Sequence, residues 1–234
     1  MSEKKVAIIQ SNYIPWKGYF DIINKADVFV IYDNVQYTKR DWRSRNKIKT
    51  PTGLEWISIP IQVKGKRHQN ICEAQVVDDK WRSKHWHSIY YNYHKAAHFD
   101  AYSKIFEKIY LEDNQVFLSQ INRTFILAIC QIMGIKTLFH NSDEFDVTGE
   151  KSERLLNICK ACDATHYISG PAAKNYLDEP LFAGNNIQVE WMDYKDYPQY
   201  SQLYDGFEHE VSIIDLIFNE GPNAIKFLNS YLEM

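Results

Sequence analysis

The sequence lacks the features that mark secreted, membrane-spanning or nucleic-acid-coating proteins. Its 234 residues include only four cysteines, too few for a disulfide framework at this length. No apolar run approaches the roughly 18 residues of a membrane helix, and the opening Met-Ser-Glu-Lys-Lys has no signal-peptide pattern. The formal net charge of -3 excludes a surface built throughout to hold nucleic acid. We therefore expect a cytoplasmic protein with reduced thiols.

The chain also lacks internal repeats and Gly/Ser-rich linkers, so we expect one domain over residues 1–234. Apolar residues make up 45% and charged residues 24% of it, which are ordinary values for a globular protein. Aromatic residues are abundant, with 16 Tyr, 12 Phe and 6 Trp. Such rings fill cores, and they also line pockets for sugars and bases because they join a flat apolar face to a polar tip.

The first third of the chain has a β-α-β pattern. Residues 6–9 form a continuous apolar run, typical of a strand buried on both faces in a parallel sheet. Pro15 stands where a helix can begin, and apolar residues then recur at helical spacing up to position 26. Residues 28–32 read as the second strand.

The remainder alternates between strand and helix patterns. Residues 56–63 alternate as a half-buried strand does, and residues 71–77 are its expected partner in a hairpin. We expect an α/β fold, a mainly parallel Rossmann-like sheet flanked by helices, with an additional β-hairpin and a helical segment. The other expected strands are 136–140, 166–169 and 187–192, and the other expected helices are 80–95, 101–111, 115–133, 151–162, 211–219 and 222–232.

Residues 10–20, Q-S-N-Y-I-P-W-K-G-Y-F, join the first strand to the first helix. In open α/β sheets ligands bind beyond the carboxyl ends of strands, where a helix start offers free N–H groups to an anion. This position favours a phosphate-bearing ligand. The alternative is a packed aromatic turn without a ligand. The candidate binding residues here are Gln10, Tyr13, Trp16 and Tyr19.

Residues 38–50 gather cations around a single acid, Asp41. Arginine forks match phosphate oxygens, so we expect a diphosphate clamp. A solvated charged face is an equal alternative, and the interleaved Trp42 also fits a groove for single-stranded nucleic acid. The cations are Lys39, Arg40, Arg43, Arg45, Lys47 and Lys49.

Residues 166–176 lead from a strand through Ser-Gly-Pro into a short helix. Ser169, Gly170 and the N–H groups that follow are candidates for holding a second anionic group, with Lys174 one turn inside the helix. The alternative makes Ser169 a helix cap and Gly170 a turn residue.

His209 is flanked by Glu208 and Glu210 and precedes a helix. Imidazole titrates near neutrality, so His209, with Glu208, is a candidate general base. A structural histidine at a helix start is the alternative.

Two other motifs are poor candidates for chemistry. Cys159 and Cys162 have C-x-x-C spacing, but no second cysteine pair stands at zinc spacing. The group of four histidines lacks the usual zinc-site spacing with an acid, and we expect no metal. These histidines are His85, His87, His94 and His98.

The chain resembles the WbqC-like family in Q-S-N-Y-I-P-W-K-G-Y-F-D, D-N-V-Q-Y-T-K-R-D-W-R-S-R-N, Y-I-S-G-P and F-E-H-E-V-S-I-I-D-L-I-F-N. The resemblance runs from about residue 5 to the C-terminal helices. It implies a role in O-antigen, lipopolysaccharide or related surface-glycan synthesis. It also adds Asp33, Gln36 and Asn46 to the expected substrate-binding residues.

A more distant likeness is to adenylyltransferases and pantothenate synthetases, which carry H-x-G-H and I-S-S/T-x-x-R-like motifs. At corresponding places this chain has residues 16–19, W-K-G-Y, and residues 168–170, I-S-G, with Lys174 nearby. Aromatic residues replace both histidines, which argues against nucleotidyl transfer.

The leading expectation is a transferase that modifies a nucleotide-linked amino sugar by N-acylation from a thioester. Acyl-CoA or acyl carrier protein is the expected donor, and no cofactor is expected to be bound permanently. Membranes and nucleic acids are not expected as partners. The alternatives are nucleotidyl or adenylyl transfer and a non-catalytic sugar-nucleotide-binding or assembly protein.

Overall fold

The computed structural model describes residues 3–232 and is an α/β fold. Short 3-10 helices lie at Ile71–Glu73, Ser142–Glu144, Pro171–Asn175 and Gly221–Phe227. The strands are β1 (Lys5–Ile9), β2 (Val28–Ile31), β3 (Arg45–Thr50), β4 (Gly53–Ser58), β5 (Leu138–Asn141), β6 (His166–Ser169) and β7 (Gln188–Trp191). The α-helices are α1 (Lys17–Lys25), α2 (Lys80–Tyr93), α3 (Phe99–Glu112), α4 (Leu118–Met133), α5 (Lys151–Ala161), α6 (Glu179–Ala183), α7 (Ile213–Glu220) and α8 (Asn229–Leu232).

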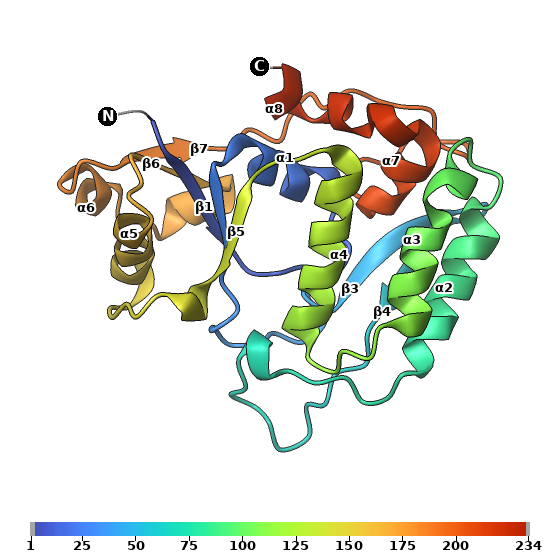
Figure 1. Ribbon diagram of the computed structural model, residues 1–234, viewed down its shortest axis with the longest axis horizontal. Coiled ribbons are helices and arrows are strands. Elements are labelled where there is room, and N and C mark those ends of the chain that lie inside the picture. Colours follow the sequence, from blue (N-terminus) through green and yellow to red (C-terminus); the bar gives the residue numbers. More distant parts are fainter. Residues whose placement is uncertain (1–2, 233–234) are drawn as a thin grey trace.

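Five strands form one parallel sheet in the order β5-β2-β1-β6-β7 (Figure 1). Numbered along the chain within this sheet alone, the order is 3-2-1-4-5, as in the first five strands of a Rossmann fold. The chain moves outward from β1 to β2 and β5, then returns to the other side of β1 with β6. The place between β1 and β6 is therefore the topological switch point, where ligands bind in open sheets of this kind.

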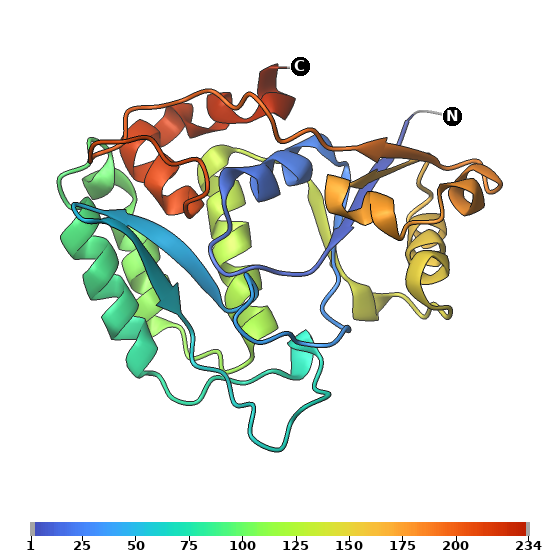
Figure 2. The same ribbon diagram turned by 180° about the vertical axis from the view of Figure 1, so that it is seen from behind.

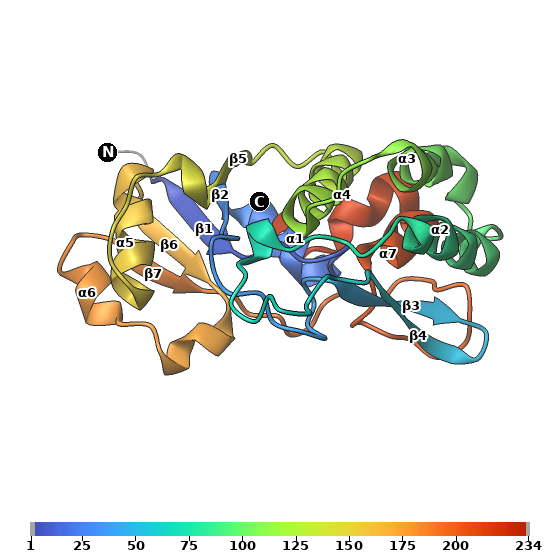
Figure 3. The ribbon, with the colours of Figure 1, turned by 90° about the horizontal axis from the view of Figure 1, so that it is seen from below.

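The central strand β1 is covered on both faces, which explains its unbroken apolar sequence. Val6 and Ile8 pack into a small core with α5 and α6, whereas Ala7 belongs to the large core that includes α1 and α4. Figures 1 and 3 show α5 and α6 on one side of the sheet and α1 and α4 on the other. The predicted mainly parallel sheet with flanking helices is confirmed.

A separate hairpin, β3 with β4, packs against α2 and comes to the front in Figure 2. The expected hairpin was wrong in its pairing. Residues 56–63 were expected to pair with residues 71–77, but only Ile61 and Val76 form a bridge. The true partner, Arg45–Thr50, carries three cations and was not among the expected strands. The sequence of this strand lacks an apolar alternation because its long charged side chains pack through their aliphatic stems while their polar ends find partners.

The predicted helices over residues 80–133 are confirmed as α2, α3 and α4. Helix α4 ends at Gly134, whose φ of 73° is the left-handed conformation expected there. The last predicted helix, residues 222–232, is instead divided into the 3-10 helix Gly221–Phe227 and α8, separated by the extended residue Leu228. No helix within residues 3–232 is long and apolar enough to cross a membrane.

Residues 192–212 form no helix or strand, yet they are tied to the rest of the fold by two buried lysines. Lys17, 2% exposed, donates to the carbonyl of Pro198 at 3.0 Å. Its ammonium lies 4.9 Å from the ring centroid of Tyr197 and 5.4 Å from that of Tyr200. Burial lowers the pKa of Lys17 to about 8.

The second lysine that holds residues 192–212 to the rest of the fold is Lys49 on β3, which is 3% exposed. Its ammonium donates to Gln202 Oε1 at 2.9 Å, to the carbonyl of Tyr204 at 2.6 Å and to the carbonyl of Gly206. The ammonium thus satisfies oxygens that a loop of this length leaves without backbone partners. We call residues 192–212 the tied segment.

Candidate functional site

A cavity of about 520 Å³ opens at the switch point, beyond the carboxyl ends of β1 and β6. Figure 3, the view from below, faces this edge of the sheet. We call it the switch-point cavity. Its volume falls in the roughly 300–1,000 Å³ range of small-molecule sites. The walls that bear on function come from Gln10, Asn12, Trp16, Tyr19, Lys151, Ser169, Gly170 and Tyr194.

Arg43 fixes the two amides that follow β1. Its Nη1 donates to Asn12 Oδ1 at 3.1 Å, and its Nη2 donates to Gln10 Oε1 at 3.2 Å. Asp41 lies 3.7 Å from Nη1, so the guanidinium has a carboxylate partner. Arg43 therefore sets a positive charge directly behind two amides of the cavity wall, with its Nε still unpartnered.

The backbone of this wall is fixed by the buried carboxylate of Asp33. Asp33 accepts from the N–H of Ser11 at 2.8 Å, from Ser11 Oγ at 2.6 Å and from Ser119 Oγ. Asn122 on α4 donates to Ser11 Oγ at 3.0 Å and to the carbonyl of Arg43 at 2.9 Å. Burial raises the pKa of Asp33, although these hydrogen bonds oppose the rise. Asp33 acts on the cavity by holding its wall in place.

Trp16 forms one side of the cavity and caps α1 without a side-chain hydrogen bond. Its indole lies edge-on to Tyr194 at 5.4 Å and to Tyr197 at 5.8 Å between ring centroids. It also folds back over Gly18, where an added Cβ would lie 2.3 Å from Trp16 Cζ2. Tyr19 lies below and donates its hydroxyl to the carbonyl of Gln10 at 3.0 Å.

The opposite wall comes from the end of β6 and the start of α5. Ser169 is buried and Gly170 begins the 3-10 helix, and both line the cavity. Lys151, the first residue of α5, contributes a cation to the same wall. Lys174 points elsewhere, with its ammonium 5.4 Å from the ring centroid of Trp191.

The other expected binding residues lie outside the switch-point cavity. Tyr13 is fully buried, and its hydroxyl bonds to His85 Nδ1 at 2.9 Å and to the hydroxyl of Tyr110 at 2.6 Å. Gln36 is exposed and donates to the carbonyl of Arg67 at 3.2 Å. Lys39 and Arg40 are exposed loop residues.

Two further residues of the cation-rich stretch 38–50, which we call the basic segment, make contacts that stabilise the β3–β4 hairpin. Arg45 stacks on Trp56, with its guanidinium carbon 4.2 Å from the ring centroid. Asn46 is buried and donates to the carbonyls of Tyr13 and Ile14 at 3.1 and 2.8 Å. The basic segment is thus divided: Arg43 reaches the switch-point cavity wall, whereas Arg45 and Asn46 organise the hairpin.

Glu208 and His209 lie on the tied segment, and neither lines the switch-point cavity. The backbone of Glu208 bonds to Gln202 in both directions, at 2.9 Å each. The His209 ring lies 4.5 Å from that of Phe207, and its Nδ1 is buried without a partner. Burial, followed by the charge of Lys17, lowers the pKa of the His209 imidazole below its usual range.

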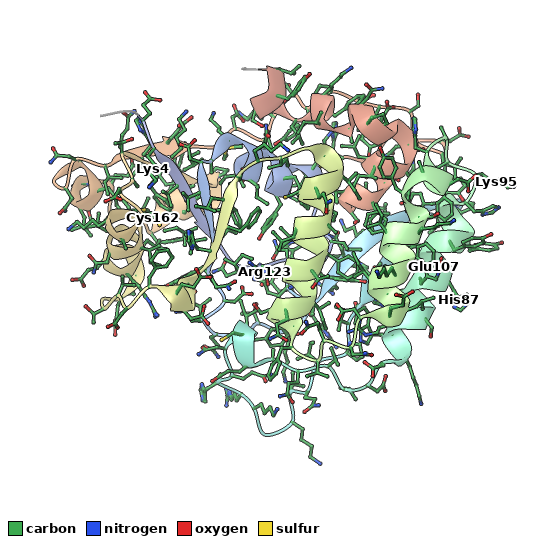
Figure 4. The ribbon with its side chains drawn as sticks, in the orientation of Figure 1. Lys4, His87, Lys95, Glu107, Arg123 and Cys162 are labelled. Atoms are coloured by element: carbon green, nitrogen blue, oxygen red, sulfur yellow. The ribbon has the colours of Figure 1, made fainter. Side chains whose placement is uncertain are left out.

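The two motifs judged unsuited to chemistry lie at opposite ends of the molecule. In Figure 4 His87 appears on α2 at one end and Cys162 after α5 at the other. Within residues 3–232, no group of three or more His, Cys, Asp or Glu side chains is placed to hold a metal ion.

The structure adds residues that the sequence did not single out. Asn12 lies inside the expected strand-to-helix turn, so the position that indicated Gln10 also indicated Asn12. Tyr194 follows β7, so the rule that carboxyl ends of parallel strands share one edge pointed to it. Nothing in the sequence signalled Asn122 or Lys151, which reach the site from helices distant along the chain.

Comparisons with known proteins agree with this picture at the level of family. Residues 10–227 match the WbqC-like protein family, which is most of the chain. The chain is 50% identical over 225 residues to the uncharacterized protein Rv1507c of Mycobacterium tuberculosis, a match that covers 96% of this chain and 97% of that protein. No solved structure matches this chain. Because the family model matches residues 10–227, most of the chain and both walls of the cavity, the chain belongs to the WbqC-like protein family.

Proposed function

We propose that the chain is a cytoplasmic transferase that modifies a nucleotide-linked amino sugar for a surface glycan such as O-antigen, by N-acylation from an acyl thioester. One observation carries the proposal: Gln10, Asn12 and Trp16 meet Ser169 and Gly170 around one cavity at the switch point. Segments about 150 residues apart in the sequence thus line one cavity from opposite sides.

The charges and rings of the cavity suit a nucleoside diphosphate. Arg43 and Lys151 place positive charge at two sides, and Ala172, whose N–H lies in the first turn of the 3-10 helix, lines the same cavity. Trp16 and Tyr194 supply apolar faces for a base or a sugar. In this proposal the diphosphate lies between Arg43 and the start of the 3-10 helix.

Acyl transfer to an amine requires an unprotonated amine, an activated carbonyl and a group that takes up the amine proton. We propose His209 for the last role, supported by its lowered pKa and its place beside Glu210, which forms part of an adjoining cavity. The N–C bond then forms as the C–S bond of the thioester breaks, and the thiolate leaves with the proton that the imidazole accepted.

Nucleotidyl transfer is a second candidate because one observation favours it. Trp16 and Tyr19, at the positions of the H-x-G-H histidines, line the same cavity as Ser169, which lies in the I-S-G segment. The missing imidazoles disfavour it, since neither an indole nor a phenol supplies their positive charge to a transferring phosphoryl group.

Mass spectrometry of reaction mixtures tests these proposals. The purified protein is incubated with UDP- or dTDP-linked amino sugars together with acyl-CoA or acyl carrier protein. We expect the sugar nucleotide to gain the acyl mass, and the rate to fall at least about a hundredfold in His209→Gln. Magnesium-dependent release of pyrophosphate from a nucleoside triphosphate would replace acyl transfer with nucleotidyl transfer. Calorimetric binding without any turnover would indicate a non-catalytic sugar-nucleotide-binding protein.

A further inference from the structure

A second, smaller cavity of about 230 Å³ adjoins the switch-point cavity. Asn12 and Trp16 line both, so the two cavities share part of one wall. The smaller cavity is placed between the turn after β1, the β3–β4 hairpin and the tied segment. Its lining residues are Asn12, Pro15, Trp16, Trp42, Asn46 and Glu210.

Trp42 is 38% exposed although its backbone is firmly held. Its carbonyl accepts from the N–H of Tyr13 at 3.0 Å, and its own N–H donates to Asp41 Oδ1 at 2.7 Å. Trp56 supports the ring from the side, at 5.2 Å between centroids. A large apolar ring is therefore presented to solvent from a fixed backbone, which is the arrangement of an aromatic stacking surface.

Within residues 3–232, Glu210 is the one charged residue in the lining of this cavity, and Lys47 beside it offsets the negative charge. Lys47 Nζ lies 3.8 Å from Glu210 Oε2 and 5.7 Å from the ring centroid of Trp42. The carboxylate and the ammonium together offer an acceptor and donors, and the Asn12 amide adds both kinds. Such a lining has no excess charge to attract an anion. It suits a neutral ring that has an apolar face and several hydroxyl groups.

We propose that the smaller cavity binds the pyranose ring of the nucleotide sugar, while the nucleoside diphosphate occupies the switch-point cavity. This assignment rests on the proposed function. The sugar's C–H face packs on Trp42, and its hydroxyl groups bond to Asn12, Glu210 and Lys47. Trp16 separates the two parts of the ligand because its indole borders both cavities.

Isothermal titration separates the contribution of the sugar from that of the nucleotide. UDP, UDP-glucose and UDP-N-acetylglucosamine are titrated into the wild-type protein, as are dTDP and dTDP-glucose. We expect the hexose conjugates to bind about tenfold more tightly than the bare diphosphates. Trp42→Leu should remove most of that difference and leave the affinity for the bare diphosphate within about twofold. Trp42→Phe, which keeps a flat ring, should retain part of the difference.

Tyr91→Leu is the matched control, because Tyr91 is 74% exposed on α2 and lines neither cavity. Its titrations should match those of the wild type. The sugar assignment is overturned if UDP and UDP-glucose bind equally, or if Trp42→Leu preserves the difference. A failure of every nucleotide to bind is a distinct result, which removes the proposed function together with this assignment.

Discussion

The contact between Gly18 and Trp16 predicts that an ordinarily stabilising substitution will destabilise this protein. Gly18 is the second residue of α1, where replacing glycine by alanine usually stabilises a helix by about 0.5–1 kcal/mol. Here the new Cβ would lie 2.3 Å from Trp16 Cζ2 and 2.7 Å from Cε2. Tyr194 and Tyr197 flank the indole, so it has little room to withdraw.

Overpacking of this kind costs about 1–3 kcal/mol, more than the helix gain. Gly18→Ala should therefore lower the free energy of unfolding by roughly 1–2 kcal/mol, equivalent to a fall in Tm of about 2–8 °C at this chain length. In a Trp16→Ala background the clash is absent. The same substitution should then raise stability by about 0.5–1 kcal/mol.

Urea unfolding of the four proteins, followed by circular dichroism, measures both steps of this double-mutant cycle. The change of sign between backgrounds is the expected result. If Gly18→Ala stabilises the protein equally with and without the indole, Trp16 does not lie over Gly18, and the wall shared by the two cavities has a different form.

Three further predictions concern the ionisable side chains of Arg43, Lys49 and His85. Arg43→Lys, which cannot hold both amides, should weaken nucleoside-diphosphate binding about tenfold with a nearly unchanged Tm, as calorimetry and thermal melting would show; an unchanged affinity contradicts the clamp. Lys49→Met should lower the free energy of unfolding by about 2–4 kcal/mol by leaving carbonyls of the tied segment unpaired, whereas Lys95→Met, at an exposed lysine, should change it little. Burial lowers the pKa of His85 to about 4, so the unfolded chain takes up a proton below pH 6.5 that the folded chain does not. Stability should thus fall by up to about 3 kcal/mol between pH 6.5 and pH 4 in urea titrations, and His85→Gln should flatten that profile.

The parallel sheet could be predicted because its strands carry their own signal. Residues 6–9 and 28–31 are continuously apolar, as buried parallel strands are, and the intervening helix has a regular apolar face. The predicted pairing of the hairpin was wrong because β3 carries cations whose partners lie far away in the sequence. Lys49 is satisfied by residues about 155 positions later, a relation that no local pattern reveals.

The sequence indicated where in the fold the candidate site lies better than it indicated which contacts each residue makes there. Ends of parallel strands meet at one edge, and this rule correctly brought Gln10, Trp16 and Ser169 together. Charge was a poorer guide within residues 38–50, because a cation on a wall and a cation supporting a hairpin look alike in sequence. Arg43 differs from Arg45 only in what the fold places beside it.

The tied segment has a thermodynamic consequence for any ligand of the smaller cavity. Because buried lysines order the stretch leading to Glu210 when the chain folds, that loss of conformational entropy does not recur when a ligand arrives. The ligand therefore binds to a pre-formed surface, and no loop has to close before it binds. Diffusion and dehydration then set its association rate. Stopped-flow rates that rise linearly with ligand concentration, without a plateau, are the kinetic signature of such a pre-formed wall.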